Sequence, residues 1–265
     1  MKFFSYLTKF FQKIFPPTYG IYEKGSFPTH RKLSLRQAKK LILAGGKKGR
    51  WEKETEFTFS FLKENFLEKN KNRQLLIVDY GIGIGRLALP ILRDYPKTKI
   101  IGVDESVSML ELAKKWLPEV FFNEKRIELL TPDQFFGKYE EKTFDLILAV
   151  YVFQHIFLRE LRKILPALHQ LLKDDGKIFI VNTFKNDDPL NREVIIKDLL
   201  RPYFEKEIEI SPYENKENYI FWMSKTGAGY GDWQKMEKAK PRCQKFMGLY
   251  RKRQFLFAGS SNGRT

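Results

Sequence analysis

The chain has 265 residues, 43% of them hydrophobic and 30% charged, a composition that excludes a disordered or fibrous protein. At roughly 100–200 residues per domain, this length suits one large domain with appendages. A single cysteine excludes an internal disulfide framework, and three histidines without metal-ligand spacing give no sign of a metal site. We therefore expect a reducing, cytoplasmic compartment.

The formal net charge of +16 is unevenly distributed along the chain. Residues 1–74 carry 17 Lys and Arg against 6 Asp and Glu, residues 75–224 carry 21 against 24, and residues 225–265 carry 10 against 2. This division predicts a basic helical extension or lid over 1–74, a globular domain over 75–224 and a basic, flexible tail over 225–265. Because the tail is Gly-rich and weakly periodic, we expect it to be dispensable for stability.

The first residues predict an amphipathic helix, with Phe3, Leu7, Phe10 and Ile14 at helical spacing. Lysines interrupt the apolar stretch, which excludes a secretory signal, and no run reaches the roughly 18 apolar residues of a membrane span. The apolar face could cover the protein's own core as a lid, which we favour. Alternatively, residues 1–15 could make a peripheral contact with an anionic membrane surface.

Two further helices are predicted before the globular domain. A basic helix covers residues 33–44 and stops at Gly45 and Gly46, and apolar positions at helical spacing predict another over 51–69. The glycines at 45–49 do not form a phosphate loop, because the GxxxxGK[ST] pattern is missing and no strand precedes them.

From residue 75 onward, short apolar runs alternate with amphipathic helical segments. This pattern predicts a parallel sheet covered on both faces, in an α/β, doubly wound architecture. Two later strands, at 205–210 and 219–223, are close enough for an antiparallel hairpin, so the expected sheet has seven strands with an antiparallel last strand. The other predicted strands cover residues 75–78, 99–103, 127–130, 144–150 and 177–181.

The most informative segment is residues 78–86, VDYGIGIGR, where the first strand passes into a helix. Glycines at such a turn let the backbone approach a ligand. A dinucleotide site would require a further glycine where the chain has Arg86. In addition, Asp79 precedes the first glycine by two positions, and a carboxylate there suits a cationic ligand better than a pyrophosphate.

A second carboxylate, Asp104, ends the next strand, 19 residues after Gly85. A carboxylate at this point can accept hydrogen bonds from both hydroxyls of a ribose. Ribose recognition without a diphosphate cradle favours a nucleoside cofactor other than a nicotinamide dinucleotide.

These segments resemble the class I S-adenosylmethionine-dependent methyltransferases. Residues 79–85 match the family's (D/E)xGxGxG motif, and further similarities follow in order at residues 102–110, 131–134, 144–156 and 171–177. Pro132 departs from the usual glycine, and residues 174–175 depart from the usual Pro-Gly. The resemblance implies a Rossmann-like fold and S-adenosylmethionine as cofactor. The cofactor-binding residues that it implies are Asp79, Gly81, Gly83, Gly85, Asp104, Glu105, Met109, Asp133, Gln134 and Val150.

Two residues after the fourth strand are candidate catalytic residues. His155 is predicted at the rim where the transferred methyl group would lie, and a neutral imidazole could take a proton from a hydroxyl nucleophile. Tyr151 is a candidate for the substrate pocket. A structural role is the alternative for both residues, and Arg86 is interpreted as a solvated or packing side chain.

The sequence indicates the acceptor only by exclusion. Residues 149–152 read AVYV instead of the [DN]PP[YF] of nucleic-acid amino-methylating enzymes, and pyrimidine C5 methylation needs a cysteine nucleophile, whereas Cys243 lies in the predicted tail. We favour O- or N-methylation of a small-molecule or lipid acceptor. An RNA-directed methyltransferase that uses the basic flanks and a non-catalytic binding module with the same fold remain as alternatives.

Overall fold

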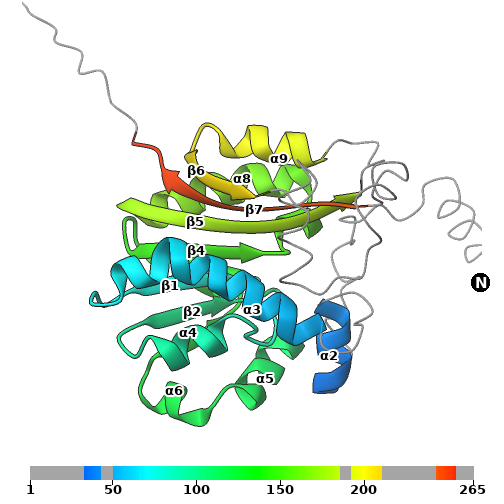
Figure 1. Ribbon diagram of the computed structural model, residues 1–265, viewed down its shortest axis with the longest axis vertical. Coiled ribbons are helices and arrows are strands. Elements are labelled where there is room, and N and C mark those ends of the chain that lie inside the picture. Colours follow the sequence, from blue (N-terminus) through cyan, green and yellow to red (C-terminus); the bar gives the residue numbers. More distant parts are fainter. Residues whose placement is uncertain (1–32, 43–49, 186–191, 211–242, 255–265) are drawn as a thin grey trace, which may run out of the picture.

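The computed structural model describes residues 33–42, 50–185, 192–210 and 243–254. Their centre is a seven-stranded sheet with helices on both faces (Figure 1). The strand order is β3-β2-β1-β4-β5-β7-β6, and among these strands β7 runs antiparallel to both of its neighbours, β5 and β6. The Rossmann-like, doubly wound, mostly parallel fold predicted from the sequence is confirmed.

The first five strands are parallel, because helices and loops return the chain to the same edge after each strand. Since β1 is paired with both β2 and β4, the strand order reverses beside it. Ligands of open α/β sheets bind in the crevice at such a point. The bounds are β1 Leu76–Tyr80, β2 Lys99–Val103, β3 Ile127–Leu130, β4 Phe144–Val150 and β5 Leu172–Lys185.

Side chains alternate between the two faces of each strand. In β1, Ile77 packs into the core on one face and Val78 into the core on the other, and both are fully buried. The first face is covered by α3 Arg50–Leu62, α4 Ala88–Asp94, α5 Val107–Trp116 and α6 Glu119–Asn123. The second is covered by α7 Pro132–Phe136, α8 Leu158–Leu171 and α9 Arg192–Leu200, the last two of which are labelled in Figure 1.

Part of the predicted N-terminal extension is core. Aromatic residues of α3 recur at helical spacing and are buried against the sheet, and the ring of Phe61 stacks on Phe179 of β5 with centroids 5.7 Å apart. The helix continues as a π-helical turn, Lys63–Leu67, and a short 3-10 turn, Glu68–Asn70. The described residues of 50–70 therefore belong to the same folded unit as the sheet.

The predicted C-terminal boundary is wrong for the last strand. The segment β7 Cys243–Lys252, predicted to lie in a flexible tail, pairs with β5 over nine residue pairs and with β6 Phe204–Ile210 on its other side. Its apolar residues Met247 and Leu249 are buried in the core. Sheet pairing between segments far apart in sequence overrides the weak local pattern. The strand predicted at 219–223 lies outside the described residues.

The predicted basic helix near residue 35 is present as α2 Leu35–Ile42. It begins after Ser34, whose hydroxyl accepts a hydrogen bond from the N–H of Gln37, while the Gln37 side chain accepts one from the N–H of Ser34. In Figure 1, α2 lies at the right-hand end of the sheet. Residues 1–32, which include the predicted amphipathic helix, lie outside the described residues. None of the described helices is both long and apolar enough to cross a membrane.

Candidate functional site

The predicted cofactor residues converge on one edge of the sheet. Asp79 lies in β1 beside the glycine loop, Asp104 directly follows β2, Asp133 lies in α7 after β3, and Val150 ends β4. Because the carboxyl ends of parallel strands meet at one edge, these four positions share the side of the sheet that α2 partly covers.

The glycine loop has the backbone that its sequence predicts. Gly81, Gly83 and Gly85 all have positive φ angles, of 81°, 57° and 83°. Other residues rarely adopt this conformation. At Gly81 a side chain would also collide with Val152, so both the backbone angle and the available space require glycine there.

Asp104 joins the glycine loop to the end of β2. Its Oδ2 accepts a hydrogen bond from the N–H of Gly83 at 2.8 Å, and its Oδ1 accepts one from the N–H of Ser106 at 2.9 Å. Burial raises the pKa of this carboxyl to about 6, while the two amide hydrogen bonds lower it. Each oxygen keeps a second lone pair, so the carboxylate can also accept from ligand hydroxyls.

Asp79 is a buried carboxyl with 5% of its surface exposed. Burial raises its pKa to about 7, from an ordinary value near 3.8, although the nearby Arg86 guanidinium lowers it and the Asp104 carboxylate raises it further. A buried carboxyl at this edge is therefore available to neutralise a cationic ligand.

A cluster around Arg86 was not expected from the sequence. Of the two roles predicted for Arg86, solvated or packing, the structure shows packing: the side chain is 6% exposed, and its guanidinium lies 5.7 Å from the ring centroid of Tyr151. The Tyr151 hydroxyl donates to Oε2 of Glu54, a buried residue of α3, at 3.2 Å. We call Glu54, Arg86 and Tyr151 the arginine cluster. Periodicity could not indicate it, because its members are distant in sequence.

Tyr151 has an unusual backbone conformation. Its φ angle is 61°, and its N–H donates to the carbonyl of Val181 at 2.6 Å. A non-glycine residue with positive φ costs conformational energy, and such residues concentrate at functional sites. Tyr151 directly follows β4, at the strand end where it was predicted to face a substrate.

Two predicted cofactor residues lie near the start of α5, Glu105 before the helix and Met109 within it. Met109 is buried against Ala38 of α2 and Ile84 of the glycine loop, whereas Glu105 is exposed. Helix α5 begins after Ser106, whose hydroxyl accepts from the N–H of Met109. Met109 therefore supports the loop that α2 covers.

The predicted adenine contacts lie at the first turn of α7. Thr131 caps this helix, and the side chain of Gln134 accepts a hydrogen bond from the N–H of Thr131 at 3.0 Å. Asp133 is exposed at the same turn. The Gln134 side chain is thus already used in a capping box, so Asp133 is the better placed of the two for a ligand.

His155 ends the short 3-10 helix Phe153–His155 after β4. It is partly buried, and its Nε2 lies 3.1 Å from Nε2 of Gln154. This places the imidazole four residues beyond Tyr151 at the same strand end.

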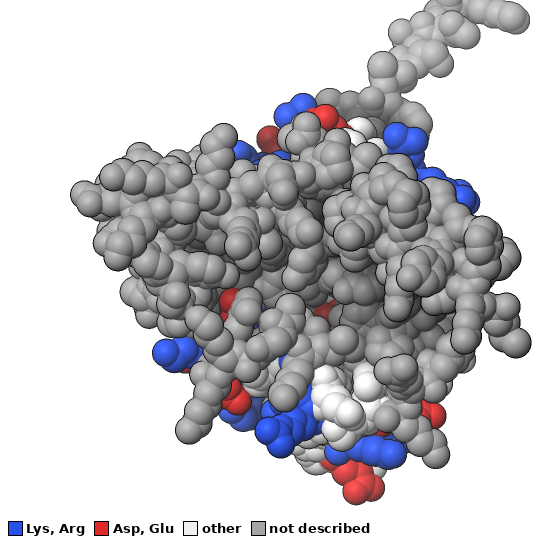
Figure 2. Space-filling model, turned by 90° about the vertical axis from the view of Figure 1, so that its right-hand side faces the viewer, with Lys and Arg blue, Asp and Glu red and all other residues white. Residues whose placement is uncertain are grey.

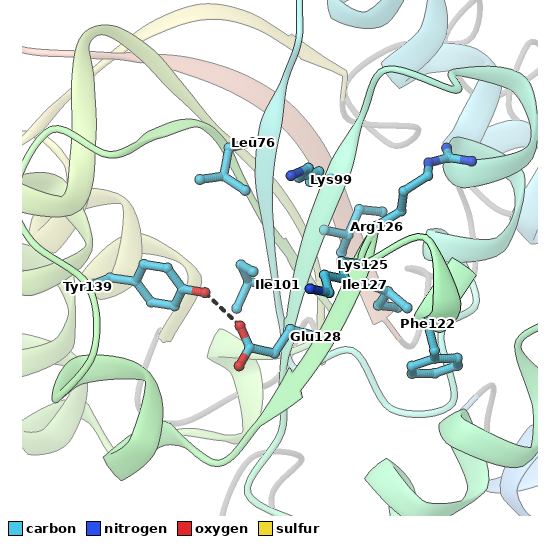
Figure 3. Close-up of a pocket in the computed structure, with 10 residues that line it drawn as sticks. Leu76, Lys99, Ile101, Phe122, Lys125, Arg126, Ile127, Glu128 and Tyr139 are labelled. Atoms are coloured by element: carbon cyan, nitrogen blue, oxygen red, sulfur yellow. Dashed lines mark hydrogen bonds between the residues drawn. The ribbon is translucent and has the colours of Figure 1, made fainter. Parts of the chain in front are cut away.

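A cavity of about 450 Å³ lies at the other end of the strands (Figure 3). Its lining includes Leu76, Lys99 and Ile127, which begin β1, β2 and β3, and the Tyr139 hydroxyl donates to Glu128 beside them. The lining includes none of the predicted cofactor or catalytic residues. Within the described part of the chain, no group of acidic, His or Cys side chains could hold a metal ion.

Comparison with known proteins agrees with this geometry. The family model described as "Methyltransferase domain" matches residues 77–176. An uncharacterized methyltransferase of Alkaliphilus oremlandii is 27% identical over 164 residues, which cover 58% of this chain and 71% of that protein. A malonyl-[acyl-carrier protein] O-methyltransferase of Halalkalibacterium halodurans is 33% identical over 120 residues, covering 44% of this chain and 42% of the relative.

The fold is also found among solved structures. A candidate sarcosine dimethylglycine methyltransferase from Galdieria sulphuraria has a TM-score of 0.54 and 14% sequence identity, over 92% of this chain and 97% of that chain. At this identity the similarity concerns the fold alone. The resemblance predicted from the sequence motifs is confirmed by the family match.

Proposed function

We propose, from the premise that residues 77–176 form a methyltransferase domain of the class I family, that this protein is an S-adenosylmethionine-dependent methyltransferase. Its acceptor would present an oxygen or nitrogen nucleophile on a small molecule or lipid. The observation that carries this proposal is the Gly83 amide bonded to the Asp104 carboxylate, beside buried Asp79.

The residues at this edge fit the chemical groups of the cofactor. Asp104 can accept from ribose hydroxyls, Asp133 can accept from an adenine amino group, and the glycine loop allows close backbone approach. Asp79 and Glu54 supply carboxylates for the cationic part of the molecule. When bound, S-adenosylmethionine supplies a methyl group that is already activated by its sulfonium charge.

The residues of this chain would therefore align the acceptor with the methyl group and exclude water from the site. Helix α2 supports both functions, because Ile42 lies 3.2 Å from the position that a Cβ of Gly83 would occupy and Ala38 is fully buried. Lys39 reinforces this cover, with its Nζ 4.2 Å from the ring centroid of Trp116 on α5. We infer that residues 33–42 are part of the lid predicted for the N-terminal extension.

His155 is our candidate for moving a proton. A hydroxyl or ammonium nucleophile must lose its proton, and a neutral imidazole at the end of β4 is chemically suited to accept it. A carboxylate nucleophile would need no base. Loss of turnover in His155→Ala with unchanged cofactor affinity would therefore support a protonated nucleophile.

A small acceptor is favoured by the name of one relative. The relative from Halalkalibacterium halodurans is named for O-methylation of a malonyl group on a carrier protein, which is not a nucleobase. Lys and Arg side chains of the described residues lie near Asp and Glu side chains when the molecule is viewed from the side of α2 (Figure 2). RNA stays the alternative acceptor, because the sequence carries its excess of Lys and Arg in the two flanks.

The cofactor assignment is tested by calorimetric titration with S-adenosylmethionine. We expect micromolar binding to the parent protein. Asp104→Ala should weaken it by about 1.5–3 kcal/mol, the value of hydrogen bonds to a charged group. Asp94→Ala, an exposed carboxylate of α4 paired with Arg93, serves as the control and should bind normally. Equal affinity of Asp104→Ala and the parent, or tighter binding of NADH, would contradict the assignment.

The acceptor is identified by label transfer. Radioactive S-adenosylmethionine and a cell extract are incubated with the protein, and the labelled fraction is separated into metabolites, lipids and RNA. Label in RNA that is lost as salt concentration rises would favour the alternative. A separate experiment tests the membrane contact that is the alternative to a lid for residues 1–15. Sedimentation of the protein with anionic vesicles is compared with its sedimentation with neutral vesicles.

A further inference from the structure

The two terminal nitrogens of the Arg86 guanidinium are buried without hydrogen-bond partners among the described residues. The side chain is 94% removed from solvent, and neither Nη1 nor Nη2 has a hydrogen-bond partner among the described residues. A buried polar atom without a partner is costly, and a buried cation more so. Such an arrangement is expected where a ligand supplies the missing acceptor.

The surroundings of Arg86 give the position of that ligand. Arg86 follows the last glycine of the loop and lies against Tyr151 at the end of β4, so its guanidinium is at the point where the strand order reverses. Burial lowers its pKa, whereas Tyr151, Glu54 and Asp79 raise it. The two carboxylates are near enough to influence the guanidinium, yet neither is hydrogen-bonded to its Nη atoms.

The geometry and charge fit a ligand with a carboxylate next to a cationic group. A guanidinium presents two parallel N–H donors that match the two oxygens of a carboxylate. Asp79 and Glu54, beside it, would face a neighbouring ammonium or sulfonium. The methionine part of S-adenosylmethionine has this pattern, with a carboxylate, an ammonium and a sulfonium within a few bonds.

We propose that Arg86 binds a ligand carboxylate through its two Nη atoms, and that this carboxylate belongs to the methionine part of the cofactor. The inference rests on the proposed function, because it assumes that S-adenosylmethionine occupies the edge between β1 and β4. A carboxylate of the acceptor is the other source of the same chemistry, and the experiment below separates the two sources.

The test compares two nucleosides that differ in the proposed contact. Calorimetry is performed with S-adenosylmethionine and with 5′-methylthioadenosine, which lacks the amino-acid carboxylate. In Arg86→Met, binding of S-adenosylmethionine should weaken about 10- to 100-fold, the scale of a charge-assisted hydrogen-bonded pair, while binding of methylthioadenosine stays nearly unchanged. Arg86→Lys should be intermediate, because it keeps the charge without the two-pronged geometry.

The exposed Arg93 on α4 provides the matched control, and Arg93→Met should bind both nucleosides like the parent. Retained methylthioadenosine binding also demonstrates that Arg86→Met is folded. Should this variant not fold, the parent protein is titrated with decarboxylated S-adenosylmethionine instead, which should bind about 10- to 100-fold more weakly than the intact cofactor.

Each outcome decides the proposal. If the parent binds neither nucleoside, the proposed function itself fails. If Arg86→Met loses both nucleosides equally, or loses nothing at all, Arg86 does not bind a carboxylate. Malonate is titrated into both proteins loaded with S-adenosylmethionine. If the parent binds malonate and Arg86→Met keeps S-adenosylmethionine but loses malonate, the carboxylate belongs to the acceptor. On the parent, equal affinity for the decarboxylated cofactor would contradict the cofactor as its source.

Discussion

At the scale of single residues, the site concentrates charge where the fold removes water. Asp79 and Arg86 are almost completely buried, and each carboxylate oxygen of Asp104 accepts a hydrogen bond from a backbone amide. Burial of charge costs stability unless a partner compensates it. Asp79 and Arg86 partly compensate each other, because each favours the charged form of the other. A bound ligand of complementary charge would add to this compensation, which ties the stability of this edge to its occupancy.

Because Asp79 is buried, the free energy of unfolding should depend on whether its carboxyl is ionised, and therefore on pH. Its pKa is raised to about 7 in the folded protein, so between pH 3.8 and 7 the folded state holds a proton that the unfolded state has released. The contribution of Asp79 to the free energy of unfolding therefore falls as pH rises through this window. Asp79→Asn removes the ionisation, and the variant should be more stable than the parent at pH 8, by on the order of 2 kcal/mol, but not at pH 4.

Urea unfolding of the ligand-free protein across this pH range measures the effect. Asp133→Asn, at an exposed position, is the control. Asp79→Asn should also bind S-adenosylmethionine more weakly than the parent above pH 7, where the parent carboxylate is ionised. Parallel pH profiles for Asp79→Asn and the parent would show that Asp79 does not titrate in this range.

A second residue-scale prediction concerns Asp145, at the edge opposite the site. This buried carboxylate accepts from the N–H of Leu76 at 2.8 Å, from Lys173 at 2.8 Å and from Arg73 at 3.3 Å, and so joins β1, β4 and β5. Asp145→Ala leaves the Leu76 amide without this acceptor and should lower the free energy of unfolding by about 1–3 kcal/mol. Urea denaturation is the measurement.

Asp94→Ala, which removes an exposed ion pair with Arg93, should cost less than about 0.5 kcal/mol in the same assay. Because Asp145 lies far from the glycine loop, its substitution should leave cofactor affinity unchanged once the protein is folded. A large loss of affinity in folded Asp145→Ala would show that the two edges of the sheet are coupled.

At the scale of elements, α2 and α3 have different roles although both precede the first strand. Helix α3 places Phe57, Phe61 and Leu62 in the main core, whereas α2 packs in a small separate cluster with Ile84 and Met109. A small cluster contributes less to global stability than the main core does. Helix α2 can therefore be loosened without unfolding the domain.

Ala38→Glu tests this separation. Ala38 has no exposed surface, so a glutamate there must either bury its carboxylate or displace α2 from the glycine loop. We expect the affinity for S-adenosylmethionine to fall about 5- to 10-fold, because α2 would no longer cover the site and roughly 1 kcal/mol of binding free energy would be lost. The melting temperature should change little. Calorimetry and thermal unfolding report the two quantities.

The matched control introduces the same residue on the exposed side of α2, as Arg36→Glu. It should change neither quantity. A large fall in melting temperature for Ala38→Glu would mean that α2 is a structural part of the core, and unchanged affinity would mean that it does not cover the cofactor.

At the scale of the whole molecule, both basic flanks enter the folded unit. The N-terminal flank contributes α3, and the C-terminal flank contributes β7, which is paired on both sides within the sheet. Lys252 of β7 is buried, and its Nζ donates to the carbonyl of Leu172. The charge excess of the flanks is therefore partly structural, and cannot be read as a nucleic-acid contact on that basis alone.

Truncation tests the role of the C-terminal flank. A chain that ends after Lys225 loses β7 and leaves β5 and β6 without their shared partner, so we expect loss of the cooperative thermal transition or a fall of many degrees in melting temperature. A chain that ends after Gln254 keeps every described residue and should melt like the parent. Equal melting temperatures of the two truncated proteins would contradict the place of β7 in the sheet.

Local pattern was sufficient to place the first five strands, the helices between them and the glycine loop, although β5, Leu172–Lys185, is longer than the strand predicted at 177–181. These features depend on residues adjacent in sequence: apolar runs of strand length, and glycines that the backbone requires at positive φ. For the same reason β2, β3 and β4 have the bounds predicted for them. The placement of Asp79 and Asp104 in one site could be predicted from these features, because parallel strands bring their carboxyl ends to one edge of the sheet.

Only the tertiary structure decided the rest, because it depends on which distant segments meet. The pairing of β7 with β5 joins residues 58 to 74 positions apart, from Lys185 with Cys243 to Lys177 with Arg251, and the ladder stabilises a segment whose own pattern is weak. In the same way, Glu54, Arg86 and Tyr151 come from three separate elements, and their burial depends on neighbours contributed by the whole fold. A sequence pattern carries the period of a helix or strand, but the partner of a side chain across the core is determined by packing.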